Sequence, residues 1–387
     1  MVKTTPVKPP MVKSEAGCFA VLNFQGYQIM AIDYAPLRAD PSLPPLLVNL
    51  YSDTQTKPTA GMKAAMMEAE VGDEQFGLDP TTNALAARMA AMMGKEAAVF
   101  LPSGTMCNQI AILTHCRPGD EILAHETAHI LTSEGGGAAA LTGAQITGLH
   151  GAKGLFDADT VRAALRSKSR YAPPQTLLEV EQTANSGGGV VWPLAQLNAV
   201  AEVAHEAGMA THIDGARLMN AVVASGVPVK EMVASYDSLW LDFTKGLGTP
   251  IGAVLCGSEA FIGAAWRWKQ RLGGAMRQSG IVAAACNYAL DHHIDRLADD
   301  HANAKALVRG LAQLDGIVPE PAETNLVFFD VVATGMTAGE LATKARAKGL
   351  ALSTTGKFRV RACTHLDVDA AGIETAVAIL RNVLAAR

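Results

Sequence analysis

The stretch LWLDFTKGLGTPIGAVLC, residues 239–256, determines how the rest of the chain is interpreted. An apolar run leads to a single lysine, Lys245, and three glycines and one proline follow within the next seven residues. Lysine is rarely buried without a partner. A lysine partly withdrawn from water where a strand ends is a usable amine nucleophile, and its natural target is an aldehyde. The alternative interpretation is an ordinary surface lysine in a turn.

The composition is that of a large globular protein. The chain has 387 residues, of which 49% are hydrophobic and 18% charged, so it can bury a sizeable core. The net charge is −5 and no basic run stands out, which disfavours nucleic acid as a partner. No stretch is long and apolar enough to predict a membrane span. Six cysteines without a C-x-x-C pair indicate a reducing compartment, so we expect a cytoplasmic protein without a metal site.

Alternating apolar and amphipathic segments indicate an α/β fold. Strands alternate with helices through most of the chain, which is typical of an open, mostly parallel sheet. The expected strands are 97–104, 121–125, 176–183, 209–215, 238–246 and 253–258, and the expected helices are 62–71, 83–94, 105–116 and 193–208. A helical bridge over 283–314 leads to a smaller α+β unit. The expected parts are an N-terminal extension outside the fold over 1–45, with Met30 as an alternative start, an N-terminal segment over 46–75, a large domain over 76–300 and a small C-terminal domain over 301–387.

Polar residues follow two of the expected strands, at the edge where ligands bind in open α/β sheets. Ser103-Gly104-Thr105 joins a strand to the start of a helix, where free N–H groups and the positive end of the helix dipole suit a phosphate. Asp214 ends another strand, and Arg217 follows three residues later. The simpler alternatives are an ordinary capped helix at the first place and a helix N-cap at Asp214.

A phosphate site, an aspartate and then a lysine about thirty residues later are together what pyridoxal 5′-phosphate (PLP) requires. The phosphate anchors the cofactor, Asp214 pairs with the protonated ring nitrogen, and Lys245 holds the aldehyde. The ring also needs a group stacked on its face. His125 and His129 lie between the phosphate loop and the aspartate, and the glycine run that follows favours His129.

Seven motifs along the chain carry a family resemblance. They are NLYSDTQTKPT (49–59), EVGDEQFGLDPTTNAL (70–85), GKEAAVFLPSGTMCNQIA (94–111), THIDGARLMNA (211–221), TKGLGTPIGAVL (244–255), GGAMRQSGI (273–281) and RACTHLD (361–367). In this order they are similar to the motifs of the low-specificity L-threonine aldolases, which are PLP enzymes of fold type I within the aspartate-aminotransferase-like group. The resemblance covers residues 49–367 and implies a large PLP-binding domain with a mostly parallel sheet and a small α+β C-terminal domain.

The resemblance also implies roles for individual residues at the cofactor. Lys245, Asp214 and His129 would be catalytic, with Lys245 carrying the cofactor, Asp214 facing the ring nitrogen and His129 stacked on the ring. Gly104 and Thr105 would hold the phosphate. His129, directly or through water, is also the candidate base.

Further residues are implied at the substrate and at a subunit interface. Ser52 and Arg361 would take the α-carboxylate of the amino acid, and Arg217 would lie near both the substrate and O3′ of the ring. Arg277 would reach a phosphate in the neighbouring subunit, because family sites form at a dimer interface and dimers pair into tetramers. We therefore expect a homodimer or homotetramer with shared active sites.

Two departures from the family concern the substrate's hydroxyl group. This chain has Glu181-Gln182-Thr183 where relatives often carry Glu-Asn-Thr. Many relatives also place a histidine upstream of that strand, aimed at the hydroxyl, and counting back without gaps reaches Tyr171. A tyrosine can hydrogen-bond a hydroxyl but is a poor base near neutral pH. The substitution bears on substrate preference rather than on the type of reaction.

The implied reaction is the cleavage of L-threonine, L-allo-threonine or a related β-hydroxy-α-amino acid to glycine and an aldehyde. The main alternative is a β-eliminating lyase or dehydratase on the same scaffold, acting on substrates such as phenylserine. A PLP-binding protein without turnover is a third possibility, which the complete set of cofactor residues and Arg361 argues against.

Overall fold

The computed structural model describes residues 22–24, 27–29 and 42–386. The expected extension over 1–45 and the alternative start at Met30 lie almost wholly outside the described residues. Within Met1–Pro44, strands β1 (Leu22–Phe24) and β2 (Tyr27–Ile29) pair in an antiparallel hairpin. Pro45–Arg387 forms a second compact unit, which contains every candidate site residue. No helix in the described part of the chain is both long and apolar enough to cross a membrane.

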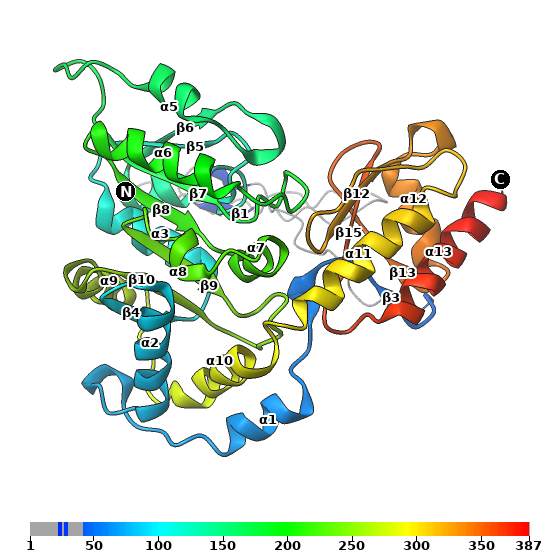
Figure 1. Ribbon diagram of the computed structural model, residues 1–387, viewed down its shortest axis with the longest axis horizontal. Helices are drawn as coiled ribbons and strands as arrows, with labels where there is room; N and C mark the ends of the chain where they lie inside the picture. Colours follow the sequence, from blue (N-terminus) through cyan, green and yellow to red (C-terminus); the bar gives the residue numbers. More distant parts are fainter. Residues whose placement is uncertain (1–21, 25–26, 30–41, 387) are drawn as a thin grey trace, which may run out of the picture. The chain divides into compact units, whose positions relative to one another are not determined.

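A seven-stranded sheet forms the centre of a large lobe, with the strand order β4-β10-β9-β8-β7-β5-β6 (Figure 1). Its strands are β4 (Ala97–Leu101), β5 (Glu121–His125), β6 (Gln145–Leu149), β7 (Gln175–Glu181), β8 (Ala210–Asp214), β9 (Ser238–Asp242) and β10 (Ala253–Gly257). Strand β10 runs antiparallel to both of its neighbours, and the remaining pairs are parallel. The predicted α/β fold with a mostly parallel sheet is confirmed.

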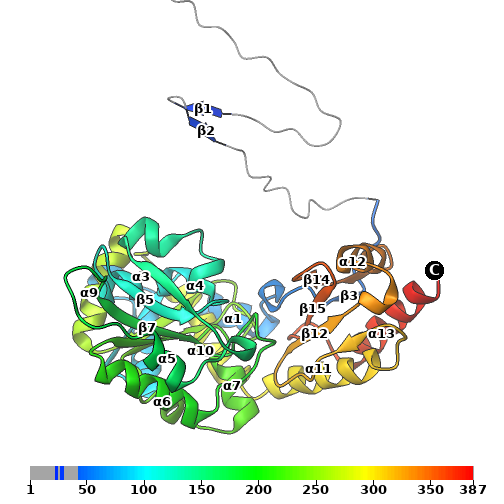
Figure 2. The same cartoon turned by 90° about the horizontal axis from the view of Figure 1, so that it is seen from above.

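Helices cover both faces of this sheet, and Figure 2 shows α3 and α6 on opposite sides. The longer helices are α1 (Ala60–Met67), α2 (Pro80–Met93), α3 (Gly104–His115), α6 (Leu194–Glu206), α7 (Leu218–Ser225), α9 (Glu259–Arg271) and α10 (Gly280–His292). The alternation of side chains along β4 separates the two faces, since Val99 packs with residues of α3 and α9 whereas Phe100 packs with residues of α2. Shorter elements of this lobe are η1 (Asp53–Gln55), η2 (Glu74–Phe76), α4 (His129–Thr132), η3 (Ala138–Thr142), η4 (Ala152–Gly154), α5 (Ala158–Ala164) and α8 (Val229–Met232).

Local signals explain the limits of several helices. Asp79 caps the start of α2 by accepting a hydrogen bond from the backbone N–H of Thr82, and Pro80 occupies the first turn. Gly94 ends the same helix in the left-handed conformation, with φ 64°, as its position in the sequence predicts.

A small lobe contains a second sheet and a second hydrophobic core. Its strands are β11 (Val318–Pro319), β12 (Leu326–Asp330), β14 (Ser353–Thr354) and β15 (Arg359–Cys363), which form an antiparallel sheet in the order β11-β12-β15-β14, and its helices are α11 (Leu297–Leu311), η5 (Val332–Thr334), α12 (Ala338–Arg346) and α13 (Ala370–Ala385). The expected continuous helical bridge is wrong, because the chain breaks between α10 and α11. The break is the place where the chain passes from one lobe to the other (Figure 1).

The N-terminal segment connects the two lobes. Strand β3 (Val48–Asn49) pairs in parallel with β13 (Leu350–Ala351) of the small lobe, and α1 packs on α10 of the large lobe. Ser52 and Asp53 lie between these two contacts, at the junction of the lobes. The predicted domain boundaries remain predictions.

Candidate active site

A cavity of about 350 Å³ lies where β7, β8 and β9 end and the two lobes meet. Eight of the residues to which the family resemblance gives a cofactor or substrate role line it: Ser52, Gly104, Thr105, His129, Asp214, Arg217, Lys245 and Arg361. These residues come from six separate parts of the sequence, and the strand ends bring them together as the topology predicts. Tyr171 and Arg277 do not line this cavity.

Lys245 lies three residues after β9, and its side chain is only 18% exposed. Its ammonium group forms an ion pair with Asp242, the last residue of the strand, and lies 5.6 Å from the centre of the Trp240 ring. The lysine that follows this apolar strand therefore has a carboxylate partner three residues before it. The following turn needs glycine at Gly252, where φ is 128° and a Cβ atom would meet the Phe100 ring at 2.6 Å.

Asp214 is the last residue of β8 and is 1% exposed. Its Oδ1 accepts a hydrogen bond from the Ala216 N–H (3.0 Å), and its Oδ2 accepts one from Asn108 Nδ2 (2.8 Å). Burial raises the pKa of Asp214, while the nearby His129 and the hydrogen bond from Asn108 oppose that rise. The residue does not cap a helix, because α7 begins after Arg217 and has no side-chain cap.

His129 belongs to a hydrogen-bonded chain that leads to Asp214. Its Nδ1 lies 2.8 Å from Oε1 of the buried Glu134, and the same oxygen accepts a hydrogen bond from Asn108 Nδ2 (2.8 Å). The hydrogen bond with Glu134 raises the pKa of His129. His125 is not part of this chain, since its two ring nitrogens contact Thr127 Oγ1 and a backbone carbonyl outside the cavity. His129 therefore lines the cavity and His125 does not, while the role of His129 at a cofactor stays a prediction.

The start of α3 forms one wall of the cavity. Ser103 caps the helix by accepting a hydrogen bond from the Met106 N–H (3.2 Å), and Gly104 and Thr105 form its first turn. The first N–H groups of a helix have no partners within the helix and suit an anion. Packing also requires the glycine, because a Cβ atom on Gly104 would lie 2.2 Å from the Trp240 ring.

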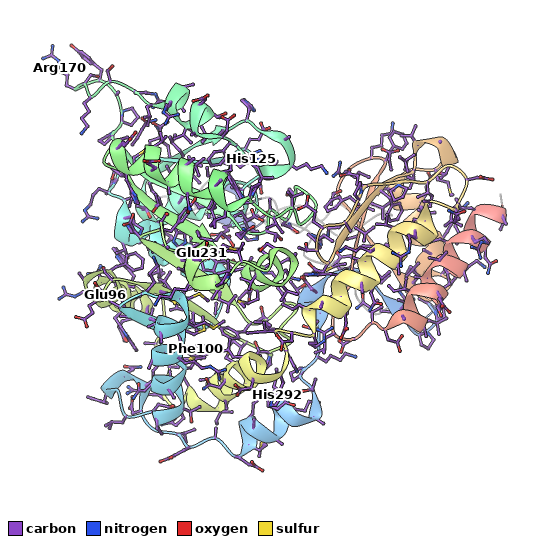
Figure 3. All side chains as sticks on the ribbon, viewed as in Figure 1. Glu96, Phe100, His125, Arg170, Glu231 and His292 are labelled. Atoms are coloured by element: carbon purple, nitrogen blue, oxygen red, sulfur yellow. The ribbon has the colours of Figure 1, made fainter. Side chains whose placement is uncertain are left out.

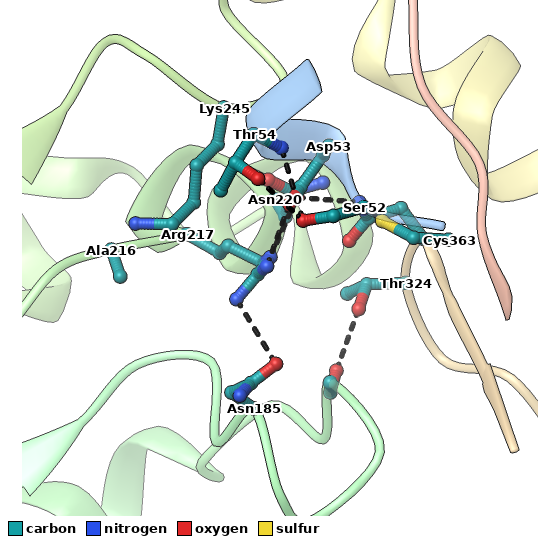
Figure 4. A network of polar contacts seen from close by, with 12 residues as sticks. Ser52, Asp53, Thr54, Asn185, Ala216, Arg217, Asn220, Lys245, Thr324 and Cys363 are labelled. Carbon is teal, nitrogen blue, oxygen red and sulfur yellow. Dashed lines mark hydrogen bonds and ion pairs between the residues drawn. The ribbon is translucent and has the colours of Figure 1, made fainter. Parts of the chain in front are cut away.

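Arg217 is held by the carboxylate of Asp53, a residue that no local sequence pattern marks as its partner (Figure 4). Asp53 accepts two hydrogen bonds from Arg217, from Nε and Nη2, both at 2.7 Å, and a third from Asn325 Nδ2 at 3.1 Å. Burial alone would raise the pKa of Asp53, but the Arg217 guanidinium holds it well below its usual range. Asp53 follows Ser52 in a quoted motif, yet its partners are distant in the chain, so position in the motif was the only available signal.

Arg361 extends from β15 of the small lobe toward the same cavity. Its Nε donates to Ser353 Oγ (3.1 Å), and its Nη1 donates to Asn185 Oδ1 (3.0 Å). Arg217 Nη1 also lies 3.5 Å from that oxygen, and Figure 4 marks this contact between Arg217 and Asn185 with a dashed line. The two guanidinium groups thus converge from different lobes on one place in the cavity.

The structure corrects the expectation for Tyr171. The residue lies in the loop between α5 and β7, is 82% exposed and stacks on Arg170, which Figure 3 labels at the outer edge of the large lobe. The site lies at the C-terminal end of β7, whereas Tyr171 precedes its N-terminal end, and a strand of this length separates the two by roughly 20 Å. Its predicted contact with the substrate within the same chain is therefore wrong.

Arg277 also lies outside the cavity, with a largely exposed side chain that pairs with Asp73 at 2.8 Å. Its expected role in a neighbouring subunit's site stays a prediction. The expected absence of a metal also stays a prediction, since His129, Glu134 and Asp214 offer ligand atoms within 4.8 Å of one another. The same atoms already take part in the hydrogen bonds described above.

The residues fit PLP by the chemistry of their donor groups. The cavity offers a helix start for a phosphate, a buried carboxylate for a ring nitrogen, an amine for an aldehyde and an imidazole beside the space between them. Its volume lies within the range of pockets that bind small molecules and cofactors.

Comparison with known proteins gives a consistent assignment. The family model described as "Beta-eliminating lyase" matches residues 49–334. The chain is 39% identical to the low specificity L-threonine aldolase of Escherichia coli (strain K12) over 340 residues, which cover 88% of this chain and all of that protein. It is 37% identical to low-specificity L-threonine aldolase 1 of Arabidopsis thaliana over 344 residues, which cover 87% and 96% of the two chains.

Solved structures show the same fold. The threonine aldolase of Leishmania major superposes with a TM-score of 0.76 at 19% identity, covering 87% of this chain and 99% of that one. A putative L-allo-threonine aldolase from Listeria monocytogenes EGD-E gives a TM-score of 0.73 at 22% identity, covering 88% and 98%. The chain therefore belongs to the beta-eliminating lyase family and, within it, to the low-specificity L-threonine aldolases.

Proposed function

We propose that the protein is a PLP-dependent aldolase that cleaves L-threonine, L-allo-threonine or related β-hydroxy-α-amino acids to glycine and an aldehyde. One observation carries the proposal: a single cavity unites Lys245, Asp214 and the start of α3 with two arginines that converge from separate lobes. Membership of a lyase family supports it. The cavity supplies both a place for the cofactor and a place for an amino-acid carboxylate.

The cofactor would be held at four points. Lys245 would bind its aldehyde carbon, Asp214 its ring nitrogen, Gly104 and Thr105 its phosphate, and His129 one face of its ring. When bound there, PLP supplies an electron sink for the bond that breaks at the α-carbon of the substrate. Asn108 orients Asp214 toward this task, because it donates to the Asp214 carboxylate and is itself held by Glu134 and by the Trp240 indole N–H, at 2.6 Å.

The arginines would fix the substrate. Arg361 and the hydroxyl of Ser52 bind the α-carboxylate, and Arg217 lies beside them with its guanidinium already oriented by Asp53. A planar guanidinium that binds a carboxylate restricts rotation about the α-carbon. Orientation of the substrate selects which α-carbon bond is cleaved, so Arg361 favours cleavage between the α- and β-carbons over other reactions.

His129 is proposed to take the proton of the β-hydroxyl. Among the described residues that line the cavity it is the one histidine. Its Nδ1 is engaged by Glu134, so its Nε2 is the ring atom left to accept a proton. The carboxylate partner raises the basicity of the ring, as the raised pKa of His129 indicates.

Replacement of Glu134 tests this assignment through pH. A neutral His129 is needed as the base, so activity is lost as the solution is acidified through its raised pKa. Glu134→Gln removes the charged partner but keeps the shape, and we expect the acid limb of kcat/KM to move to lower pH. The measurement is the pH profile of kcat/KM, with Glu202→Gln, an exposed residue of α6, as the control. An acid limb that stays in place in the Glu134 variant would remove His129 from the role of base.

The assembly and compartment belong to the same proposal. Arg277 is proposed to reach the phosphate of a neighbouring subunit in a homodimer or homotetramer with shared sites, and its exposed side chain supports this role. A cytoplasmic location is supported by five cysteines that are buried and free in the described part of the chain.

A panel of substrates tests the proposed function. Glycine release is measured with L-threonine, L-allo-threonine and the isomers of β-phenylserine. Because Tyr171 lies outside the cavity, it does not replace the histidine that many relatives aim at the substrate's β-hydroxyl. One hydrogen bond to that hydroxyl is worth about 0.5–1.5 kcal/mol. The kcat/KM values of the two threonine diastereomers should therefore differ by no more than about tenfold. Failure of every member of the panel to yield glycine would refute the proposed function, and a hundredfold preference for one diastereomer would require a second group at the hydroxyl.

A further inference from the structure

A buried carboxylic acid lies one layer beneath the site, in the middle of β7. Glu179 is 1% exposed, and neither of its carboxyl oxygens has a hydrogen-bond partner in the described part of the chain. Alternation along the strand places Glu179 on the same face as Glu181, which lines the cavity. Buried polar atoms almost always have partners, so this group requires an explanation.

The neighbouring strand supplies a second unpartnered atom. In the parallel register of β7 and β8, Glu179 lies beside His212 and Glu181 lies beside Asp214. His212 is also 1% exposed, and its Nε2 has no partner among the described residues. Its Nδ1 lies 2.8 Å from Ser238 Oγ, and His115 Nε2 lies 2.8 Å from the same oxygen. Two polar groups without partners thus face α3 from adjacent positions of adjacent strands.

In the part of the chain that the structure describes, Glu179 has no cationic partner. Three basic side chains of the site are paired with other carboxylates: His129 with Glu134, Arg217 with Asp53 and Lys245 with Asp242. The fourth, Arg361, donates instead to Ser353 Oγ and Asn185 Oδ1. His212 and His115 cannot supply a charge, because burial lowers their pKa values to about 3 and about 4.

The charges that do act on Glu179 are negative. Burial, and then Asp214, Glu181 and Glu134, raise the pKa of Glu179. Burial and the neighbouring Asp214 also raise the pKa of Glu181, to about 7. Burial, and after it the neighbouring Glu179, raise the pKa of Tyr236. An ionised Glu179 would therefore be an unpaired charge among carboxylates, which is the most costly arrangement in a protein interior.

We propose that Glu179 is an uncharged carboxylic acid at neutral pH and shares its proton with Nε2 of His212 through one internal water. Both unpartnered groups are then satisfied, since the acid donates and the neutral imidazole accepts. The layer beneath Asp214 carries one negative charge fewer, so Glu179 acts as a positioning residue that allows Asp214 to stay ionised. The role of Asp214 at a ring nitrogen rests on the proposed function, but the protonation of Glu179 does not.

The proposal predicts a dependence of stability on pH with a definite sign. An unfolded glutamate loses its proton above about pH 4.3. The folded protein keeps the proton on Glu179 over a range above that value, so the folded state binds more protons and loses stability as pH rises. The loss approaches about tenfold in the folding equilibrium constant per pH unit until the folded group also ionises. Glu179→Gln removes this loss while keeping a neutral side chain of the same shape.

The test compares melting temperatures of the cofactor-free protein between about pH 5 and about pH 8. Relative to wild type, Glu179→Gln should gain stability steadily as pH rises, whereas the exposed control Glu202→Gln should follow wild type throughout. Glu179→Ala should lose stability at acid pH yet show the same reduced slope, because it also lacks the titrating group. If Glu179 had a purely structural role, its variants would have lower melting temperatures at every pH, and the slope of melting temperature against pH would match that of wild type.

Difference infrared spectra give an independent result. The wild type minus Glu179→Gln spectrum near neutral pH should contain the carbonyl band of a protonated carboxylic acid, and His212→Phe should shift or remove that band. Parallel pH profiles of wild type and Glu179→Gln, or a carboxylate band in place of the acid band, would overturn the proposal. The two proposals can fail separately. If the expected pH slope and infrared band are observed but the enzyme shows no aldol cleavage, the proposed function is refuted and the protonation of Glu179 is not.

Discussion

Lys245→Ala is expected to abolish measurable turnover. The variant loses the amine proposed to hold the cofactor, and loss of a positioned proton-transfer group alone costs about 10²–10⁴ in rate. We expect kcat to fall by at least that factor. The purified variant should also lose the covalent attachment that borohydride fixes in the wild type, and peptide mapping of the reduced wild-type protein should find the label on Lys245.

The exposed Lys57 provides a matched control for this variant. Lys57→Ala should keep wild-type activity and cofactor content, because its side chain is exposed and does not line the cavity. Wild-type turnover in Lys245→Ala, or a label on another lysine, would contradict the assignment. Circular dichroism of both variants verifies that the fold is retained.

Asp53→Asn should have the largest effect on stability. The change leaves Arg217, which is 5% exposed, buried without its counter-ion. Breaking a buried ion pair by removing one partner costs about 3–5 kcal/mol. We expect a decrease of that size in the free energy of unfolding, measured by denaturant titration, together with a large loss of kcat/KM, because Arg217 is no longer oriented.

The effect of Asp53→Asn should depend on pH. A carboxyl with a lowered pKa contributes stability above its unfolded value of about 3.9 and loses that contribution as pH falls toward the folded value. The difference between wild type and variant should therefore shrink on acidification. Asp291→Asn is the control, since it removes one partner of an exposed pair with Arg88 and should cost about 0–1 kcal/mol. Equal effects of the two substitutions would show that the buried Asp53–Arg217 pair contributes no more to stability than an exposed pair.

The sequence predicted the parts of the site that lie at strand ends. Asp214 and Lys245 follow apolar strands, and Ser103 and Gly104 begin a helix that leaves a strand, so topology alone places them at one edge. Strand β6 escaped notice because its sequence, QITGL, is partly exposed and follows a glycine-rich run, which weakens the strand pattern.

Contacts between distant parts of the chain could not be predicted in the same way. Asp53 pairs with Arg217, 164 positions away in the sequence, and no local pattern marks that partnership. Glu134 was visible beside a glycine run, but its contacts with Asn108 and His129 depend on how α3 packs on the sheet. Tyr171 was predicted to contact the substrate but lies far from the cavity. Counting residues back from a motif ignores which end of a strand a residue occupies.

The products formed from L-threonine test the central claim most directly. The purified enzyme with PLP is incubated with L-threonine, and glycine and acetaldehyde are quantified against ammonia and 2-oxobutanoate in the same samples. Cleavage between the α- and β-carbons, which the two converging arginines and His129 are proposed to favour, predicts glycine and acetaldehyde in equal amounts. Ammonia and 2-oxobutanoate in equal amounts, without glycine, would contradict the account and identify a β-eliminating lyase on the same scaffold.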